Sequence, residues 1–103
     1  MKPLFLIGYM GCGKSTLGRK LARRLGIGFV DTDTLVEEQA GASVADVFRY
    51  EGEARFREAE REALERAIAA GGEAVVSTGG GLPTWGDNMQ RMNGVGHTVF
   101  LRR

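Results

Sequence analysis

The chain has 103 residues, of which 43% are hydrophobic and 26% are charged. This length and composition predict one globular domain with a core of modest size. The 14 Lys and Arg residues nearly balance the 13 Asp and Glu residues, which leaves a formal net charge of +1. Such a balance argues against a global electrostatic attraction to nucleic acid or to an anionic membrane, so neither is an expected partner.

The sequence holds one cysteine, Cys12, which cannot form an intramolecular disulfide. This favours a reducing compartment, and we expect a cytoplasmic protein. Lys2 and the apolar residues after it superficially resemble a secretory signal, but the apolar run is very short and Lys14 follows soon after it. We therefore expect no targeting segment, and no stretch approaches the ~18 apolar residues that a membrane span needs.

The first predicted elements are a strand, a glycine-rich turn and a helix. Residues 4–8, with the sequence LFLIG, form a continuous apolar run that is typical of a strand buried on both faces of a parallel sheet. Residues 14–25 combine regularly spaced leucines with arginines and lysines, which predicts an amphipathic helix. Its predicted apolar face consists of Leu17, Leu21, Ala22 and Leu25. Residues 28–33, GFVDTD, then predict a second strand that ends in two aspartates.

Helices dominate the middle of the chain. Residues 34–70 have helical character with breaks near Gly41 and Gly52, and Ser43 is suited to cap the second of these helices. Later elements are a third strand within residues 73–81, a short helix within residues 86–93 and a fourth strand at residues 97–101. Strands separated by helices indicate an α/β fold, a mostly parallel sheet flanked by helices.

The turn after the first strand carries a phosphate-binding motif. Gly8, Gly13, Lys14 and Ser15 satisfy the pattern G-x-x-x-x-G-K-[ST] between a predicted strand and a predicted helix. Backbone N–H groups in such a loop surround a polyphosphate, the lysine reaches the β- and γ-phosphates, and the serine hydroxyl ligates Mg²⁺. The predicted nucleotide-binding residues are Gly11, Cys12, Gly13, Lys14, Ser15 and Thr16.

Two aspartates at the end of the second predicted strand are candidate site residues. Asp31 and Asp33 are two positions apart, so on a strand both side chains would point to one side, toward the phosphate-binding loop. Such carboxylates can hold Mg²⁺ through water or accept a proton from an attacking hydroxyl. Alternatively, one of them caps the helix that begins near Leu35, and the spacing alone leaves both interpretations open.

Arg57 and a run of three glycines have competing interpretations as well. The spacing between Glu53 and Arg57 suits a solvated ion pair on a helix. The glycines at 79–81 could form a simple turn after a strand. However, the carboxyl ends of strands form the ligand crevice of open α/β sheets, and glycines there let a substrate lie against the main chain.

These residues occur in the order and approximate spacing of the shikimate kinases, small P-loop kinases that phosphorylate shikimate with ATP. The resemblance rests on GYMGCGKST at 8–16, DTD at 31–33, Arg57 with Glu60, and STGGG at 77–81, and it spans the whole chain. Residues 82–93, LPTWGDNMQRMN, depart from the commonest family pattern and resemble the loop and helix of one bacterial branch.

The resemblance implies a three-layer P-loop kinase fold and a reaction that transfers the γ-phosphate of ATP to shikimate with Mg²⁺, on the route to chorismate and the aromatic amino acids. Lys14 and Asp33 would be catalytic, and Ser15 and Asp31 would serve the metal. The implied shikimate-binding residues are Asp33, Arg57, Gly79, Gly80 and Gly81. We expect a monomer whose partners are ATP and shikimate.

The chain is shorter than the resemblance requires. Shikimate kinases continue past the fourth predicted strand with an arginine-bearing lid, another strand and a final helix, whereas this chain ends at Arg103. We therefore expect residues 1–103 to be a partial P-loop kinase domain, incomplete at its C-terminus, in which residues 34–64 form a helical substrate-binding subregion. The alternatives are a gluconate kinase relative, disfavoured by Arg57 and the triple glycine, and a noncatalytic nucleotide-binding module.

Overall fold

The computed structural model of the protein describes residues 3–8, 14–70, 73–79 and 81–101. Its elements are β1 (Leu4–Gly8), α1 (Lys14–Leu25), β2 (Gly28–Asp31), α2 (Thr32–Ala40), α3 (Val44–Ala69), β3 (Ala74–Ser77), the 3-10 turn η1 (Leu82–Thr84), α4 (Asn88–Val95) and β4 (His97–Leu101). Every predicted strand and helix is present. Across the described ranges, no helix has both the length and the apolar character that crossing a membrane requires.

All four strands are parallel and lie in the order β2-β3-β1-β4. The α/β prediction is therefore confirmed. Leu6 pairs with Ser77 of β3 on one side and with Val99 of β4 on the other, so β1 is an inner strand. Parallel strands bring their carboxyl ends to one edge of the sheet, which places the residues that follow β2 and β3 close together.

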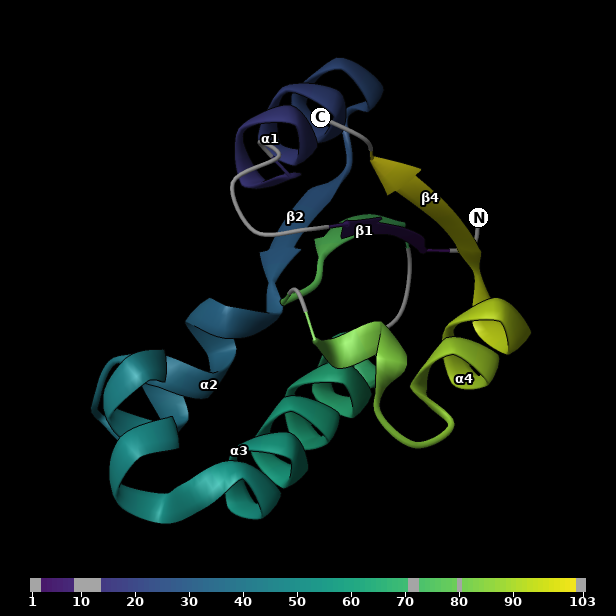
Figure 1. Ribbon diagram of the computed structural model, residues 1–103. Helices are drawn as coiled ribbons and strands as arrows, with labels where there is room; N and C mark the ends of the chain where they lie inside the picture. Colours follow the sequence, from purple (N-terminus) through teal and green to yellow (C-terminus); the bar gives the residue numbers. More distant parts are fainter. Residues whose placement is uncertain (1–2, 9–13, 71–72, 80, 102–103) are drawn as a thin grey trace.

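Helices cover both faces of the sheet, as the three-layer prediction requires. Figure 1 shows α1 on one side of the strands and α3 with α4 on the other. The buried cluster on the α1 side consists of Leu6, Ala22 and Val75. The buried cluster on the opposite side consists of Phe5, Ile7, Leu64, Ala67, Val76, Leu82 and Met92. Successive residues of β1 and β3 thus point to opposite faces, which explains why both strands read as unbroken apolar runs.

The helical subregion between β2 and β3 has a small core of its own. Helix α2 ends at Gly41, which adopts a left-handed conformation with φ of 68°. Ser43 caps α3 by accepting a hydrogen bond from the Asp46 N–H at 3.1 Å, as predicted. The backbone is non-helical at Gly52, so α3 consists of two helical pieces joined at a kink. The buried residues that hold α2 against α3 are Val36, Val47, Phe56 and Ala63.

Helix α1 differs from its predicted apolar face in one respect. Leu21 and Ala22 pack toward the sheet, but Leu17 and Leu25 are 46% and 53% exposed. The helix lies close against the sheet at Gly18, where an added Cβ would lie 2.6 Å from Cε1 of Phe29 and 3.2 Å from Cδ1 of Leu6. The buried stripe therefore runs through positions 18, 21 and 22, and the two outer leucines lie at its margins.

We expect Gly18→Val to lower the free energy of unfolding by about 1–3 kcal/mol, because the new methyl groups overpack the contact with Phe29. The matched control is Gly94→Ala in α4, where an added Cβ meets nothing within 4 Å. That change should raise the free energy of unfolding by about 0.5–1 kcal/mol, since alanine is the better helix former. Urea denaturation measures both, and a stabilising effect of Gly18→Val would contradict the packing described here.

Candidate active site

Ser15 and Asp31 meet at the carboxyl edge of the sheet. Ser15 lies in the first turn of α1, and its hydroxyl donates a hydrogen bond of 2.7 Å to Oδ2 of Asp31. The other carboxylate oxygen of Asp31 accepts from the backbone N–H groups of Asp33 at 2.9 Å and Thr34 at 3.4 Å. Asp31 is therefore the N-cap of α2, which confirms the capping interpretation for this aspartate, and it is also the partner of Ser15.

The donor atoms of this pair suit Mg²⁺. A hydroxyl oxygen and a carboxylate oxygen are hard ligands of the kind that Mg²⁺ prefers, and they lie 2.7 Å apart. The backbone of Lys14 begins α1, and Thr16 follows Ser15 as an exposed residue. The other predicted phosphate-binding residues, Gly11, Cys12 and Gly13, lie outside the described residues, as does Gly80.

Asp33 lies in the first turn of α2 and not on a strand, because β2 ends at Asp31. The prediction that the two aspartates share one face of a strand is therefore wrong. Asp33 nevertheless reaches the glycine segment at residues 79–81, since a Cβ added to Gly79 would lie 2.6 Å from Oδ1 of Asp33. The backbone N–H of Gly79 donates to the buried Thr32 hydroxyl at 3.1 Å, which ties the end of β3 to the start of α2.

A pocket of about 820 Å³ opens between α2, α3 and the segment after β3. Its wall combines carboxylates, arginines, aromatic rings and main chain. The residues that line it include Asp31, Asp33, Phe48, Phe56, Arg57, Glu60, Gly79 and Gly81. The rings of Phe48 and Phe56 pack edge to face with centroids 5.6 Å apart, so one wall is apolar while charged groups face it. Such a pocket suits a small polar molecule that carries a charge and an apolar part.

Arg57 is held by a buried partner that the sequence did not single out for this purpose. Its Nη1 donates to Oε1 of Glu60 at 2.6 Å, and its Nη2 lies 3.8 Å from Oε2 of Glu53. The side chain of Glu60 is 2% exposed and that of Arg57 is 17% exposed. The predicted pair with Glu53 is present, but the shorter contact with Glu60 turns the guanidinium toward the pocket.

Gly79 and Gly81, the described glycines of the segment at residues 79–81, allow charged side chains to approach the main chain closely. A Cβ at Gly79 would lie 3.0 Å from Oε2 of Glu60, and one at Gly81 would lie 2.7 Å from Nη2 of Arg57. Any larger residue would therefore displace a carboxylate or the guanidinium. The structure thus brings Asp33, Arg57, Gly79 and Gly81 to one pocket next to Ser15 and Asp31.

The environment of Glu60 makes stability depend on pH. Burial raises the pKa of the Glu60 carboxyl above its ordinary value of 4.5, the hydrogen bond and charge of Arg57 oppose this rise, and Asp33 adds to it. A raised folded-state pKa contributes stability that is fully present below about pH 4.5 and is lost as the pH rises through the folded-state value.

We expect the Glu60→Gln variant to lack this contribution. The free energy of unfolding of the parent, relative to that of Glu60→Gln, should therefore fall as the pH rises from about 4.5. Urea denaturation at a series of pH values measures the difference. Glu58→Gln, an exposed glutamate on the same helix, is the control and should leave the parent profile unchanged. A parent profile that rises relative to Glu60→Gln over this range would contradict the assigned direction.

Sequence reasoning missed Glu60 as the orienting partner of Arg57, and it missed the apolar wall of Phe48 and Phe56. The signal for Glu60 was available, because it lies three positions after Arg57 on one helix. A phosphate-binding motif between a parallel strand and a helix, with a serine–carboxylate pair at the end of the next strand in the chain and a pocket lined by charged side chains beside it, is typical of the P-loop kinase class of α/β folds.

Comparison with known proteins assigns the family within this class. The model of the shikimate kinase family matches residues 10–103. Curated relatives include the shikimate kinases of Azobacteroides pseudotrichonymphae, 43% identical over 99% of this chain, and of Bacteroides fragilis, 50% identical over 98% of this chain. The chain belongs to the shikimate kinase family. It spans 60% and 56% of the length of these two relatives.

Solved structures agree with this assignment. The 1.7 Å crystal structure of the Bacteroides thetaiotaomicron shikimate kinase superposes with a TM-score of 0.93 at 46% identity, covering 98% of this chain and 59% of that one. The shikimate kinase of Acinetobacter baumannii in complex with shikimate gives a TM-score of 0.93 at 36% identity, covering 100% of this chain and 57% of that one. The resemblance inferred from the motifs is therefore confirmed.

Proposed function

We propose that this protein supplies the catalytic and substrate-binding groups of a shikimate kinase, which transfers the γ-phosphoryl group of ATP to the 3-hydroxyl of shikimate. The observation that carries the proposal is the convergence of Asp33, Arg57 and the residue 79–81 segment on one pocket adjacent to the Ser15–Asp31 pair. Support also comes from the similar Acinetobacter baumannii structure, which is in complex with shikimate.

The pocket suits recognition of the acid. The planar guanidinium of Arg57 can donate two parallel hydrogen bonds to a carboxylate, and Glu60 fixes its orientation through the 2.6 Å contact. The main chain at Gly79 and Gly81 lines the pocket beside the charged side chains, and Phe48 and Phe56 offer an apolar surface to the carbon skeleton of the ring. We therefore assign shikimate binding to Asp33, Arg57 and the segment 79–81, with residues 34–64 as the main part of its subregion.

Asp33 is the group best suited to handle the proton of the attacking hydroxyl. Its carboxylate lies beside Gly79 in the pocket, and Asp33 is two residues after the Asp31 cap. In this role it orients the 3-hydroxyl and accepts its proton as the oxygen bonds to the γ-phosphorus and the bond from phosphorus to the bridging oxygen breaks. ADP leaves with the electron pair of that bond.

The proposal that the protein binds ATP is based on the phosphate-binding motif. We assign ATP phosphates to residues 11–16, with Lys14 directed to the transferred group, and Mg²⁺ to Ser15 directly and to Asp31 through water. When bound, the metal neutralises charge on the phosphates. A monomeric state and a cytoplasmic location remain predictions from the sequence.

Calorimetric titration of this chain with shikimate, with D-gluconate and with Mg-ATP tests the proposal, together with shikimate-dependent ADP release. We expect heat from shikimate and from Mg-ATP but not from gluconate. Binding of gluconate instead of shikimate would support the gluconate kinase alternative. Binding of Mg-ATP without binding of either acid would leave a nucleotide-binding module and overturn the proposed acceptor.

A further inference from the structure

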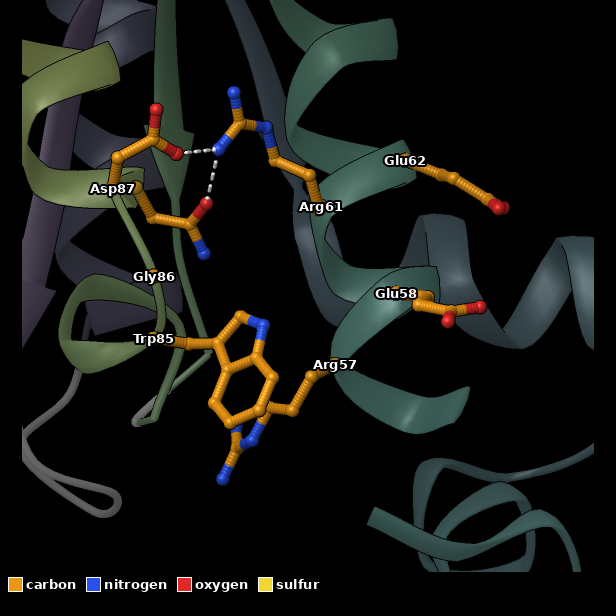
Figure 2. A pocket seen from close by; sticks show the side chains of 8 residues that line it. Arg57, Glu58, Arg61, Glu62, Trp85, Gly86 and Asp87 are labelled. Carbon is orange, nitrogen blue, oxygen red and sulfur yellow. Dashed lines mark hydrogen bonds and ion pairs between the residues drawn. The ribbon is translucent and has the colours of Figure 1, made fainter. Parts of the chain in front are cut away.

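One helical turn after Arg57, a second arginine connects α3 to the loop that follows the glycine segment. Nη1 of Arg61 forms an ion pair with Oδ1 of Asp87 and donates to Oδ1 of Asn88 at 2.8 Å. Figure 2 shows Arg61 reaching across to Asp87, while Glu58 and Glu62 of the same helix point away from this loop. Nη1 of Arg61 therefore joins α3 to this loop.

Asn88 connects Arg61 to the glycine segment through further hydrogen bonds. It is 1% exposed, and both ends of its side-chain amide are used. Its Oδ1 accepts from Arg61, and its Nδ2 donates to the carbonyl of Leu82 at 2.9 Å. The N–H of Leu82 in turn donates to the carbonyl of Gly79 at 3.2 Å. A continuous path of hydrogen bonds thus runs from α3 through Asn88 to the proposed acid-binding main chain.

The outer end of this path is anchored in α4. Nε of Arg61 donates to Oε2 of Glu65 at 3.0 Å, and Glu65 also accepts from Nε and Nη2 of Arg91 at 2.8 and 2.9 Å. The hydrogen bond from Arg91 is the main cause that lowers the pKa of Glu65, and the one from Arg61 is the main cause that lowers the pKa of Asp87. Both acids therefore stay ionised and hold Arg61 between two elements.

We propose that Arg61 and Asn88 are positioning residues for acid binding: they fix the loop after β3 against α3 and thereby set the separation between the Arg57 guanidinium and the main chain at Gly79 and Gly81. This inference rests on the proposed function. The separation is tight, because a Cβ at Gly81 would lie 2.7 Å from Nη2 of Arg57. Arg57 and Arg61 lie about one turn apart on the same helix. The contacts of Arg61 with the loop therefore hold the loop close to Arg57, the arginine proposed to bind the acid.

The expected effect follows from how steeply binding depends on geometry. Misplacement of a positioned group by ~1 Å can cost up to about a hundredfold in rate, and loss of the contacts of Arg61 with the loop is a smaller disturbance. We expect Arg61→Ala to raise the Kd for shikimate by about tenfold and to change the Kd for Mg-ATP by less than about twofold, since Ser15 lies on α1, on the opposite face of the sheet from α3. Arg55→Ala is the control, because Arg55 pairs with Glu58 and Glu62 of the same helix.

A double-mutant cycle separates positioning from a general loss of structure. If Arg61 acts through the placement of Arg57 against the loop, Arg61→Ala should raise the Kd for shikimate by less than about twofold once Arg57 is already alanine. Asp87→Asn provides a milder variant, because its side chain is 64% exposed, and should raise that Kd by about two- to threefold. Titrations followed by NMR chemical shifts can measure these weak affinities.

The outcomes distinguish the inference from the function on which it rests. Failure of the parent chain to bind shikimate overturns the proposed function, and the positioning role with it. Parent binding with an unchanged Kd in Arg61→Ala overturns the positioning role alone. Equal losses of shikimate and Mg-ATP affinity, or full additivity with Arg57→Ala, also overturn it and make Arg61 a residue of general stability.

Discussion

Replacing Arg57 with alanine is expected to weaken shikimate binding by about a hundredfold while leaving the Kd for Mg-ATP within about twofold. Arg57 is 17% exposed and is the arginine that Glu60 orients into the pocket. A hydrogen bond to a charged group contributes about 1.5–3 kcal/mol, and each 1.4 kcal/mol corresponds to a tenfold change in affinity. Calorimetric titration of both ligands measures the two constants.

The same substitution should also reduce stability. Removal of one partner of a buried ion pair typically costs about 3–5 kcal/mol, because the remaining charge has no compensation, and Glu60 is 1% exposed. Arg57→Lys is the matched variant: it keeps the positive charge but loses the planar guanidinium, so its shikimate affinity should lie between those of the parent and the alanine variant. An alanine variant with parental shikimate affinity would remove Arg57 from the acid-binding site.

The second large effect is expected for Asp33→Asn, which should lower shikimate-dependent ADP release by about 10²–10⁴-fold. Asparagine has nearly the shape of aspartate and can still bond a substrate hydroxyl, but it cannot accept the proton of the attacking one. The Kd for shikimate should therefore change by much less than the rate does, since the loss arises in the transfer step. A coupled ADP assay and a binding titration on the same variant separate the two quantities.

Glu38→Gln is the control for the Asp33 experiment. Glu38 lies on the same helix, is exposed and is outside the pocket around Asp33. It should leave both the rate and the affinity at the parental values. An Asp33→Asn variant that retains the parental rate of ADP release would show that another group, or water, accepts the proton.

Much of the fold could be predicted because local physics determines it. The unbroken apolar run of residues 4–8 reflects a strand covered by α1 on one face and by α3 and α4 on the other. Ser43 caps α3 as its residue type predicts, and glycines mark the end of α2 and the kink in α3. One error concerns a boundary: β2 ends at Asp31, whose carboxylate caps the next helix, so Asp33 lies in a helical turn and not on a strand. The other concerns the apolar face of α1, of which Leu17 and Leu25 are exposed.

The site was predicted less completely, because several of its charged side chains have more than one possible partner. Arg57 has Glu53 before it and Glu60 after it at helical spacing. The sequence does not distinguish these two partners, whereas the structure shows that the contact with Glu60 is the shorter one. Arg61 has a partner on its own helix, Glu65, but it also binds Asp87 and Asn88, which are far away in the sequence. No periodicity signals a contact of that kind, since it depends on how the chain returns to α3 after β3.

The two hydrogen-bonding roles of the Asp31 carboxylate have a thermodynamic consequence for the two proposed substrates. One oxygen accepts from the Ser15 hydroxyl, on the side proposed for the nucleotide, and the other caps the helix that carries Asp33, on the side proposed for the acid. A ligand that engages Ser15 therefore alters the charge distribution at the start of that helix. The affinities of the two substrates are then linked, and linkage is reciprocal: whatever factor Mg-ATP imposes on the affinity for shikimate, shikimate imposes on the affinity for Mg-ATP.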